Sequence, residues 1–361
     1  MTTMIYHAPY ALNPQSVSAS AIRPIQMLDA FRSLGIEVLD ITGYAAERRK
    51  RWRAVKRRIA AGQRIDFMYS ETATIPAMVT EPRHLPPHFF LDLGIMRHCH
   101  NHGIPVGVFY RDVYWKFDEY DERVGQPLAA LMKAVYRYEI AGYNRWCSRV
   151  YLPSVEMAEY LPPADHYKPL PPGGEIVKAT NTSEALNVFY IGGIGGHYRL
   201  HHLCEAVRTL PQVNLTVCTD RARWESVKNE YPQVDSPNIS IVHKSGKDRD
   251  ELYQWATVCY VAMDPEPYGA FASPVKLYEY IARGKPILAT DNTLVSRVVH
   301  KNKIGWSTPN SIDSIRAILH HLDNNPQEVA RARNECENVR QAHTWQARAR
   351  QVVADLTGKT P

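Results

Sequence analysis

Residues 273–289 have the sequence SPVKLYEYIARGKPILA, in which a serine and a proline precede a helical pattern. Pro274 presets the backbone dihedral of a helix start, and Ser273 precedes it as the expected N-cap. Lys276 and Glu279 are three residues apart, so they lie on one face of a helix. The stretch therefore predicts a helix that carries a cation and an acid close to its N-terminal end.

A helix N-terminus attracts anions, because its free N–H groups and the helix dipole both favour negative charge. We expect Lys276 to add positive charge for a phosphate. Glu279, one turn deeper, can accept hydrogen bonds from two neighbouring hydroxyls, such as those of a ribose. The alternative is an ordinary surface pair of the two side chains, worth about 0.2–0.5 kcal/mol. The spacing alone does not decide between these interpretations.

The stretch resembles the donor-site motif of GT-B glycosyltransferases, in the large retaining group often called family 4. The resemblance implies an α/β protein in which two Rossmann-like parallel-sheet domains face across a cleft. It implies that Glu279 binds the ribose of a UDP- or GDP-sugar and that Lys276 lies near the diphosphate. Ser273, Pro274 and Val275 would complete this donor site. The expected reaction is a sugar transfer that retains configuration.

The chain departs from the family's pattern at one position. Many members carry two glutamates eight residues apart, the first of them beside the transferred sugar, and here Phe271 stands eight residues before Glu279. We expect Glu266 in the upstream loop, or backbone N–H groups of residues 269–272, to take that place. Glu266 is therefore a candidate catalytic residue.

A glycine-rich stretch, residues 190–199 (YIGGIGGHYR), follows a predicted strand and precedes a predicted helix. Glycines let a backbone approach a phosphate closely. We expect Gly193 and Gly195 to contact the donor and Arg199 to bind its diphosphate, although Arg199 can equally be a surface arginine at a helix start. Lys244 ends a later strand at the same sheet edge, where we expect the nucleobase; the alternative is a solvated loop lysine.

Apolar, β-branched runs alternate with helical patterns, which predicts βαβ units and parallel sheets. Residues 161–174, rich in proline and glycine, predict a linker between two domains. We expect an acceptor-binding domain over residues 1–170 and a donor-binding domain over residues 175–343. A last helix, about residues 344–358, is expected to pack back on the first domain. The predicted strands are residues 4–8, 37–41, 66–70, 106–110 and 150–152, then 187–191, 214–218, 240–243, 259–262, 286–289 and 305–307.

Polar residues that follow strands of the first half are candidates for the acceptor side, because catalytic groups collect at the carboxyl ends of parallel strands. We expect Arg111 and Asp112 to be catalytic residues there, with Tyr114 and Trp115 stacking on sugar rings. The alternative is a purely structural pair of Arg111 and Asp112. Asp112 or Glu71 could act as a general base if the reaction were inverting.

Two further features of the first half concern anions and metals. Ser18, before the first predicted helix, is expected to help aim N–H groups at the donor phosphate, with simple helix capping as the alternative. His98 and His102 share a helical face, but no carboxylate stands at ligand spacing, so we expect no zinc site. We expect a metal-independent enzyme without a cofactor, in which dipoles and cations neutralise the leaving diphosphate.

Residues 48–58 (RRKRWRAVKRR) hold eight cations in eleven positions. We expect this helix to rest on an anionic membrane surface through Arg48, Arg49, Lys50, Arg51 and Trp52; a solvated basic helix is the alternative. Nucleic acid is not an expected partner, because no nucleic-acid module accompanies the cations.

The composition indicates a cytoplasmic globular protein. The chain is 45% hydrophobic and 22% charged, and its six cysteines form no C-x-x-C pair, which is typical of reduced thiols. We expect neither a secretory signal nor a membrane span.

We therefore expect a hexosyltransferase that acts on a glycan or lipid-linked glycan in cell-surface polysaccharide synthesis, on the inner face of the cell membrane. One alternative is a Rossmann-type NAD(P)-dependent oxidoreductase that uses residues 192–196, with Asp220 as an imperfect match to the acid its fingerprint requires. The other is a non-catalytic protein that binds sugar nucleotides.

Overall fold

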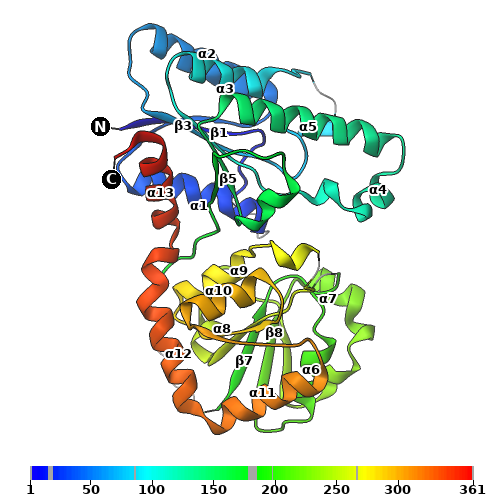
Figure 1. Ribbon diagram of the computed structural model, residues 1–361. Helices are drawn as coiled ribbons and strands as arrows, with labels where there is room; N and C mark the ends of the chain where they lie inside the picture. The colour runs from blue at the N-terminus through cyan, green and yellow to red at the C-terminus, as the bar shows by residue number, and fades with distance from the viewer. Residues whose placement is uncertain are drawn as a thin grey trace. The chain divides into compact units, whose positions relative to one another are not determined.

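The computed structural model describes residues 2–14, 19–84, 87–177, 185–196, 198–265 and 267–359. The chain divides into two compact units, Met1–Pro171 with Trp345–Pro361, and Pro172–Thr344 (Figure 1). Each unit contains a six-stranded sheet in which every pair of neighbouring strands is parallel. The α/β class expected from the alternating pattern is confirmed.

The first sheet changes direction beside its first strand. The chain moves from β1 to β2 on one side and then to β3 on the other, which places a topological switch point between β1 and β3. Ligands of open parallel sheets bind at the carboxyl ends of the strands at such a point. The strands, in spatial order, are β2 (Glu37–Thr42), β1 (Thr3–Ala8), β3 (Phe67–Glu71), β4 (Val106–Phe109), β5 (Arg149–Leu152) and β6 (Tyr167–Pro169).

Helices cover both faces of this sheet. Since parallel crossovers are right-handed, the reversal at the switch point puts the helix after β1 on one face and those after β2, β3 and β4 on the other. The helix α13 packs against α1, whereas α2, α3 and α5 are neighbours on the opposite side (Figure 1). These helices are α1 (Ala19–Ser33), α2 (Ala45–Ala60), α3 (Leu91–Asn101), α4 (Asp118–Val124), α5 (Leu128–Trp146) and α13 (Trp345–Thr357).

The predicted linker at residues 161–174 needs a correction. Its middle, Tyr167–Pro169, is the strand β6, which pairs with β5. Proline lacks an N–H and is tolerated in a strand at the edge of a sheet, where β6 lies. The unit boundary at Pro171 and Pro172 falls within the predicted stretch. Proline density alone therefore did not separate a linker from an edge strand.

The second sheet has its switch point between β7 and β10. The chain moves from β7 to β8 and β9 on one side and returns to β10 on the other, so the carboxyl ends of β7 and β10 are neighbours. In spatial order the strands are β12 (Gly305–Thr308), β11 (Ile287–Thr290), β10 (Val258–Val261), β7 (Asn187–Ile191), β8 (Asn214–Cys218) and β9 (Ile239–Val242).

Two apolar cores lie on the two faces of the second sheet. Successive side chains of a strand alternate in direction, so Val188 and Tyr190 enter one core and Phe189 and Ile191 the other. One core includes α6 and α11, and the other includes α8, α9 and α10. The helices are α6 (His201–Arg208), α7 (Arg221–Val227), α8 (Arg249–Trp255), α9 (Val275–Ala282), α10 (Leu294–Asn302), α11 (Ile312–Asn324) and α12 (Pro326–Val339).

The basic helix α2 is not exposed on all sides. The Arg48 side chain is 1% exposed, donates to the Gly43 carbonyl at 2.6 Å and to an Asp92 carboxylate oxygen at 3.1 Å, and so ties α2 to α3. Trp52 is buried beside the His98 ring. The expectation that Arg48 and Trp52 contact a membrane is therefore wrong, because the inner face of α2 is packed against protein.

Candidate functional site

The glycine-rich loop leaves the carboxyl end of β7 in a shape that glycine permits. Gly192, Gly195 and Gly196 have φ angles of 134°, 86° and 60°, a region that side chains disfavour. Gly195 and Tyr198 exchange backbone hydrogen bonds of 3.0 and 3.2 Å, which closes the loop on itself. The loop thus presents backbone, with few side chains, at the switch point of the second sheet.

Lys276, in the first turn of α9, reaches this loop. Its ammonium donates a hydrogen bond to the Tyr190 hydroxyl at 2.8 Å and lies 4.1 and 4.3 Å from the ring centres of Tyr190 and Tyr198. A Cβ atom at Gly192 would lie 2.8 Å from the same nitrogen, so glycine at this position makes room for the lysine. We call Lys276, Tyr190, Tyr198 and Gly192 the lysine cage.

The lysine cage holds its cation by aromatic rings and a hydroxyl. No ion pair joins Lys276 to Glu279 in the described part of the chain, which argues against the surface-pair alternative. Burial lowers the pKa of Lys276 to about 7, against a smaller opposing effect of the Glu279 charge. An anion beside the ammonium would restore its charge, because an opposite charge favours the charged form.

Glu279 lies one helical turn beyond Lys276 and is half-buried. Its carboxylate accepts a hydrogen bond from the Tyr253 hydroxyl at 3.3 Å, and the Arg283 guanidinium lies over the ring of Tyr253. Arg283 itself pairs with Asp250 at 3.1 Å. Since a carboxylate has about four acceptor positions, Glu279 retains capacity for further donors.

The start of α9 differs from the sequence expectation. Pro274 occupies the N-cap position, with φ −72° and ψ 141°, and no side chain caps this end of the helix. Ser273 instead shares a hydrogen bond of 3.0 Å with the Tyr278 hydroxyl, so the expected capping role of Ser273 is wrong. Val275 begins the helix. The first N–H groups of α9 therefore lack a competing side-chain acceptor, as an anion site requires.

The other two predicted cations of the second unit are exposed. The Arg199 guanidinium donates to the Gly196 carbonyl at 3.2 Å, which keeps it on the glycine-rich loop. Lys244 pairs with Glu251 at 2.9 Å and follows β9, which is separated from β7 by β8. At a strand spacing of about 4.8 Å, Lys244 starts roughly 10 Å from the end of β7. The structure brings Arg199 to the lysine-cage loop and leaves Lys244 further along the edge.

Part of the loop between β10 and α9 cannot bind the nucleotide sugar through its backbone N–H groups, because these groups are hydrogen bonded within the loop. Phe271 is buried, and the N–H groups of Phe271 and Ala272 donate to the Tyr268 carbonyl at 3.3 and 2.9 Å. A Cβ atom at Gly269 would lie 2.1 Å from the Asp264 carbonyl oxygen, so this turn requires glycine. Of the backbone donors expected at residues 269–272, two are therefore engaged within the loop. Glu266 lies outside the described residues.

At the carboxyl edge of the first sheet, two guanidinium groups share one carboxylate. Glu71 is fully buried and accepts hydrogen bonds from Arg23 at 3.1 Å and from the Tyr69 hydroxyl at 2.6 Å. Arg111 lies 3.6 Å from the other Glu71 oxygen and donates to the Tyr10 hydroxyl at 3.1 Å. We call Arg23, Glu71 and Arg111 the arginine cluster. Because Glu71 is engaged by both cations, it is a poor candidate for a general base.

The structure corrects one predicted acceptor contact. Trp115 is 2% exposed, lies parallel to the Tyr136 ring at 5.0 Å and donates to the Tyr110 hydroxyl. It therefore cannot stack on a sugar. Asp112 accepts a hydrogen bond from the Tyr114 backbone N–H at 2.9 Å, which shapes the turn after β4.

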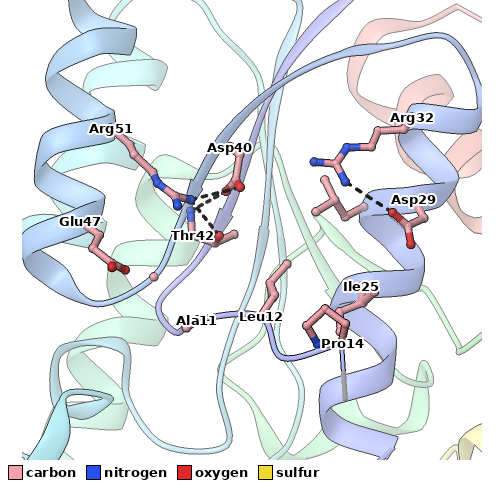
Figure 2. A pocket seen from close by; sticks show the side chains of 12 residues that line it. Ala11, Leu12, Pro14, Ile25, Asp29, Arg32, Asp40, Thr42, Glu47 and Arg51 are labelled. Carbon is pink, nitrogen blue, oxygen red and sulfur yellow. Dashed lines mark hydrogen bonds and ion pairs between the residues drawn. The ribbon is translucent and has the colours of Figure 1, made fainter. Parts of the chain in front are cut away.

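A pocket of about 470 Å³ opens at the carboxyl ends of β1 and β2, between α1 and α2 (Figure 2). On one wall Arg51 pairs with Asp40 at 3.1 Å and donates to Thr42; on the other Asp29 pairs with Arg32 at 3.5 Å. Apolar side chains, including those of Leu12, Ile25 and Leu28, complete the lining. Such alternation of acids, bases and apolar surface suits a ligand rich in hydroxyl groups. No motif of the sequence indicates this pocket, because its walls come from separate stretches of the chain.

A buried chain of polar groups lies beneath this edge. His7 contacts the Ser70 hydroxyl through one ring nitrogen and Asp92 through the other, each at 2.8 Å. Burial alone would raise the pKa of Asp92, but His7 and Arg48 outweigh it and lower that pKa. All of these side chains are buried, so the arrangement resembles a nucleophilic triad only in order and serves to join β1, β3 and α3.

Three further expectations concern Ser18, the pair of His98 and His102, and Asp220. Ser18 lies outside the described residues. His98 and His102 stack on each other at 4.0 Å, and the described residues contain no group of three or more His, Cys, Asp and Glu side chains placed to hold a metal. Asp220 caps α7 by accepting from the Arg223 N–H at 2.9 Å, so the acid that a dinucleotide fingerprint would use serves a helix.

Sequence reasoning missed the tyrosines. Tyr190, Tyr198 and Tyr253 position Lys276 and Glu279, but each is a common strand, loop or helix residue in the sequence. The only available signal was the position of Tyr190 and Tyr198 on either side of the glycines.

Comparisons with known proteins show which family and which fold the chain is similar to. Residues 185–324 match the family described as glycosyl transferases group 1. A comparison with curated protein sequences finds no match.

Solved structures resemble the chain over nearly its whole length. They include HepE of Anabaena in complex with UDP and glucose, at 14% identity and a TM-score of 0.62, covering 99% of this chain and 100% of that one. Sucrose-phosphate synthase of Thermosynechococcus elongatus is 15% identical, with a TM-score of 0.65 and 97% of each chain covered. WaaG, a glycosyltransferase involved in lipopolysaccharide biosynthesis, is 13% identical, with a TM-score of 0.57, covering 98% and 100%. At such identities the likeness shows the fold alone, and it confirms the expected GT-B fold.

Proposed function

We propose that the protein is a nucleotide-sugar-dependent glycosyltransferase whose donor binds around Lys276 and Glu279, because residues 185–324 match the group 1 glycosyl transferases and the chain has the GT-B fold. The observation that carries this assignment is the lysine cage. Lys276 is a half-buried cation that no carboxylate of the described residues pairs with, next to a glycine-rich backbone loop and a helix start that no described side chain caps.

The donor's diphosphate lies against Lys276, the N–H groups at the start of α9 and the loop that carries Gly193 and Gly195. Arg199, exposed on the same loop, supplies a second cation for the phosphates. Glu279 accepts the ribose hydroxyls, while Tyr253 holds the carboxylate in place. Lys244, held by Glu251 further along the edge, lies on the side of the nucleobase.

The chemistry is charge stabilisation of the leaving group. As the bond between the sugar and the diphosphate breaks, negative charge grows on the phosphate oxygen nearest the sugar. A cation and N–H dipoles fixed in a water-poor site stabilise that charge without reorganising. The leaving phosphate takes the acceptor's proton, and the configuration of the sugar is retained. These groups perform the neutralisation that a metal ion would otherwise supply, and Glu266 contacts the donor sugar.

The acceptor binds at the carboxyl edge of the first sheet. Arg111, partly exposed and held by Glu71 and Tyr10, and Asp112 beside it face the reacting hydroxyl. The pocket between α1 and α2 has the size and the polar walls for sugar residues of a glycan. We assign the acceptor to a glycan or a lipid-linked glycan of cell-surface polysaccharide synthesis, made in the cytoplasm at the inner face of the membrane.

The test is a calorimetric titration with UDP-glucose, UDP-N-acetylglucosamine, GDP-mannose and NADH. We expect one class of nucleotide sugar to bind and NADH not to bind. Glu279→Ala is expected to lower the affinity for the nucleotide sugar at least tenfold, because loss of a hydrogen bond to a charged group costs about 1.5–3 kcal/mol.

A matched control exists on α11. Asp313 and Arg316 form an exposed acid–base pair with the same three-residue spacing as Lys276 and Glu279. Asp313→Ala is expected to leave nucleotide affinity unchanged. Equal affinities of Glu279→Ala and Asp313→Ala for the nucleotide sugar would refute the proposed donor site.

A further inference from the structure

The helix α5 exposes an apolar stripe to solvent. Leu128, Leu131 and Tyr138 are 52%, 62% and 41% exposed, and the spacing of three and seven residues puts them on one face. Ala134 and Ala141 lie on the same face and are exposed as well. The opposite face of α5 is buried in the first unit through Tyr136, Ile140 and Tyr143. Because apolar helix faces are normally buried, the second apolar face of α5 is expected to pack against another molecule.

Two phenylalanines extend this stripe beyond the helix. Phe89 and Phe90, directly before α3, are 39% and 68% exposed, and their rings contact each other with centres 4.9 Å apart. The Phe89 ring lies 5.7 Å from that of Tyr138 on α5. Of the seven large hydrophobic side chains exposed among the described residues, five therefore belong to one connected patch, a concentration that marks an interaction surface.

The same side of the sheet carries the basic helix. Figure 1 shows α2, α3 and α5 as neighbours, and α3 contacts both of the others. Arg49 is hydrogen bonded to His88, the residue before Phe89, at 3.0 Å. The exposed cations Arg53, Lys56 and Arg57 follow along α2, and α5 adds Arg137 and Arg145.

Acidic groups hardly offset these cations. The three helices hold twelve Lys and Arg residues but only three acids, and two of those, Asp92 and Glu139, are buried. Acidic side chains do gather on α4, near Leu128, where Asp121 pairs with Lys133. The apolar patch is thus bordered by positive charge at its Phe90 and Tyr138 end and by negative charge at its Leu128 end.

We propose that this face, formed by Phe89, Phe90, Leu131 and Tyr138 with the α2 cations, binds the surface of a bilayer that contains anionic lipid. The apolar side chains enter the boundary between headgroups and acyl chains, and the cations lie at the level of the lipid phosphates. No helix of the described residues is long and apolar enough to cross a membrane.

The charge pattern selects lipid over a second copy of the chain. The three helices carry twelve Lys and Arg residues against three acids, so two such faces would each bring an excess of positive charge, which opposes their pairing. Anionic lipid supplies the missing negative charge. The membrane contact itself does not depend on the proposed function. Only its role in giving access to a lipid-linked acceptor rests on that function.

Vesicle co-sedimentation tests the inference with the full chain. We expect binding to vesicles of phosphatidylcholine with phosphatidylglycerol, weaker binding at high salt, and none to phosphatidylcholine alone. Phe90→Gln with Leu131→Gln, and separately Arg53→Gln with Lys56→Gln, are each expected to reduce the bound fraction at least fivefold. Val155→Gln, at an exposed apolar residue outside the patch, and Arg331→Gln with Lys301→Gln, at exposed cations of the second unit, serve as matched controls and should bind as the parent does.

Two results would overturn the proposal. One is parental vesicle binding by the Phe90 and Leu131 variant. The other is a parent that light scattering shows to be a dimer and that this variant converts to a monomer, since the face would then be a protein interface. Thermal unfolding checks that the variants fold. Hydrolysis of the nucleotide sugar without vesicles should stay unchanged in them, so failure of the membrane contact and failure of the donor site give different readouts.

Discussion

Two cations at sheet edges, the buried Arg23 and the half-buried Lys276, differ in what neutralises them. Arg23 of the arginine cluster has Glu71 as a fully buried counter-charge. Lys276 has two tyrosine rings and a hydroxyl, and no ion pair in the described part of the chain. Burial by itself would lower the pKa of Arg23, but Glu71 and Tyr69 outweigh it and raise that pKa, whereas burial lowers the pKa of Lys276 to about 7. The charge of Arg23 is therefore neutralised within the fold, whereas Lys276 can still bind an anion.

The largest expected effect comes from removing the carboxylate that neutralises Arg23. Glu71→Gln leaves Arg23 and Arg111 without their carboxylate, and removal of one partner of a buried ion pair costs about 3–5 kcal/mol. Urea unfolding should show this loss. Asp29→Asn, which removes an exposed pair with Arg32 in the same unit, should change stability by less than about 1 kcal/mol. Equal effects of the two variants would mean that the cluster is not a structural unit.

Lys276→Met tests the cation that pairs with no carboxylate of the described residues. We expect kcat/KM for the nucleotide sugar to fall by about 100- to 1,000-fold, as for the loss of a fixed donor to a developing negative charge. The melting temperature should stay the same or rise, because the variant no longer buries an amine. Lys285 is a buried lysine of this unit, and it donates to the Ala256 carbonyl at 2.8 Å. Lys285→Met should lower stability without reducing kcat, the reverse of the Lys276 result.

Glu139 sharpens the comparison, because it is a buried acid with which no cation of the described residues forms an ion pair. Burial raises the pKa of Glu139 to about 8, although the Ala77 N–H donates to it at 2.7 Å. Between pH 4.5 and about 8 the folded protein keeps a proton that the unfolded chain has lost, so stability falls as pH rises through this range. In Glu139→Gln this part of the decline should vanish, a gain of about 1–3 kcal/mol at pH 8. Denaturant titrations at pH 5 and pH 8 measure it, and parallel pH profiles would contradict the assignment.

The smallest effect concerns pH and donor affinity. If the diphosphate binds protonated Lys276, affinity is highest below pH 7 and falls as pH rises above it, because binding must then take up a proton. The dissociation constant should rise by up to about tenfold for each pH unit, until the pKa of the complex is reached. A nucleotide sugar, whose phosphates do not titrate in this range, is the ligand to use. Lys276→Arg should remove the pH dependence, and a persistent profile would assign it to another group.

Much of the fold followed from local pattern. Eleven of the twelve strands coincide with predicted runs to within about a residue or two, since β-branched stretches between helical patterns mark parallel strands. The exception is β6, an edge strand whose prolines are as typical of a linker as of a strand at the edge of a sheet. The α9 stretch was also recognised, because helix signals, a cation and an acid occur within seven residues.

The partners of the site residues could not be found in this way. Tyr198 and Tyr190 meet Lys276 from 78 and 86 residues away, and Tyr253 meets Glu279 from 26. Arg48 and Trp52 looked like surface residues of a basic helix because helical periodicity gives the faces of a helix but not which face is covered. The exposed stripe of α5 was overlooked for the same reason: an apolar helix face is normally assigned to the core.

The sequence by itself determined where strands and helices form and which short segment carries a cation and an acid on one helical face, because these depend on neighbours within a few residues. Only the tertiary structure decided which charges are compensated. It gave Arg23 a carboxylate, gave Lys276 aromatic rings, buried Arg48 and left Phe90 in solvent. The free energy of a charge or an apolar surface depends on what surrounds it in space, and those surroundings come from distant parts of the chain.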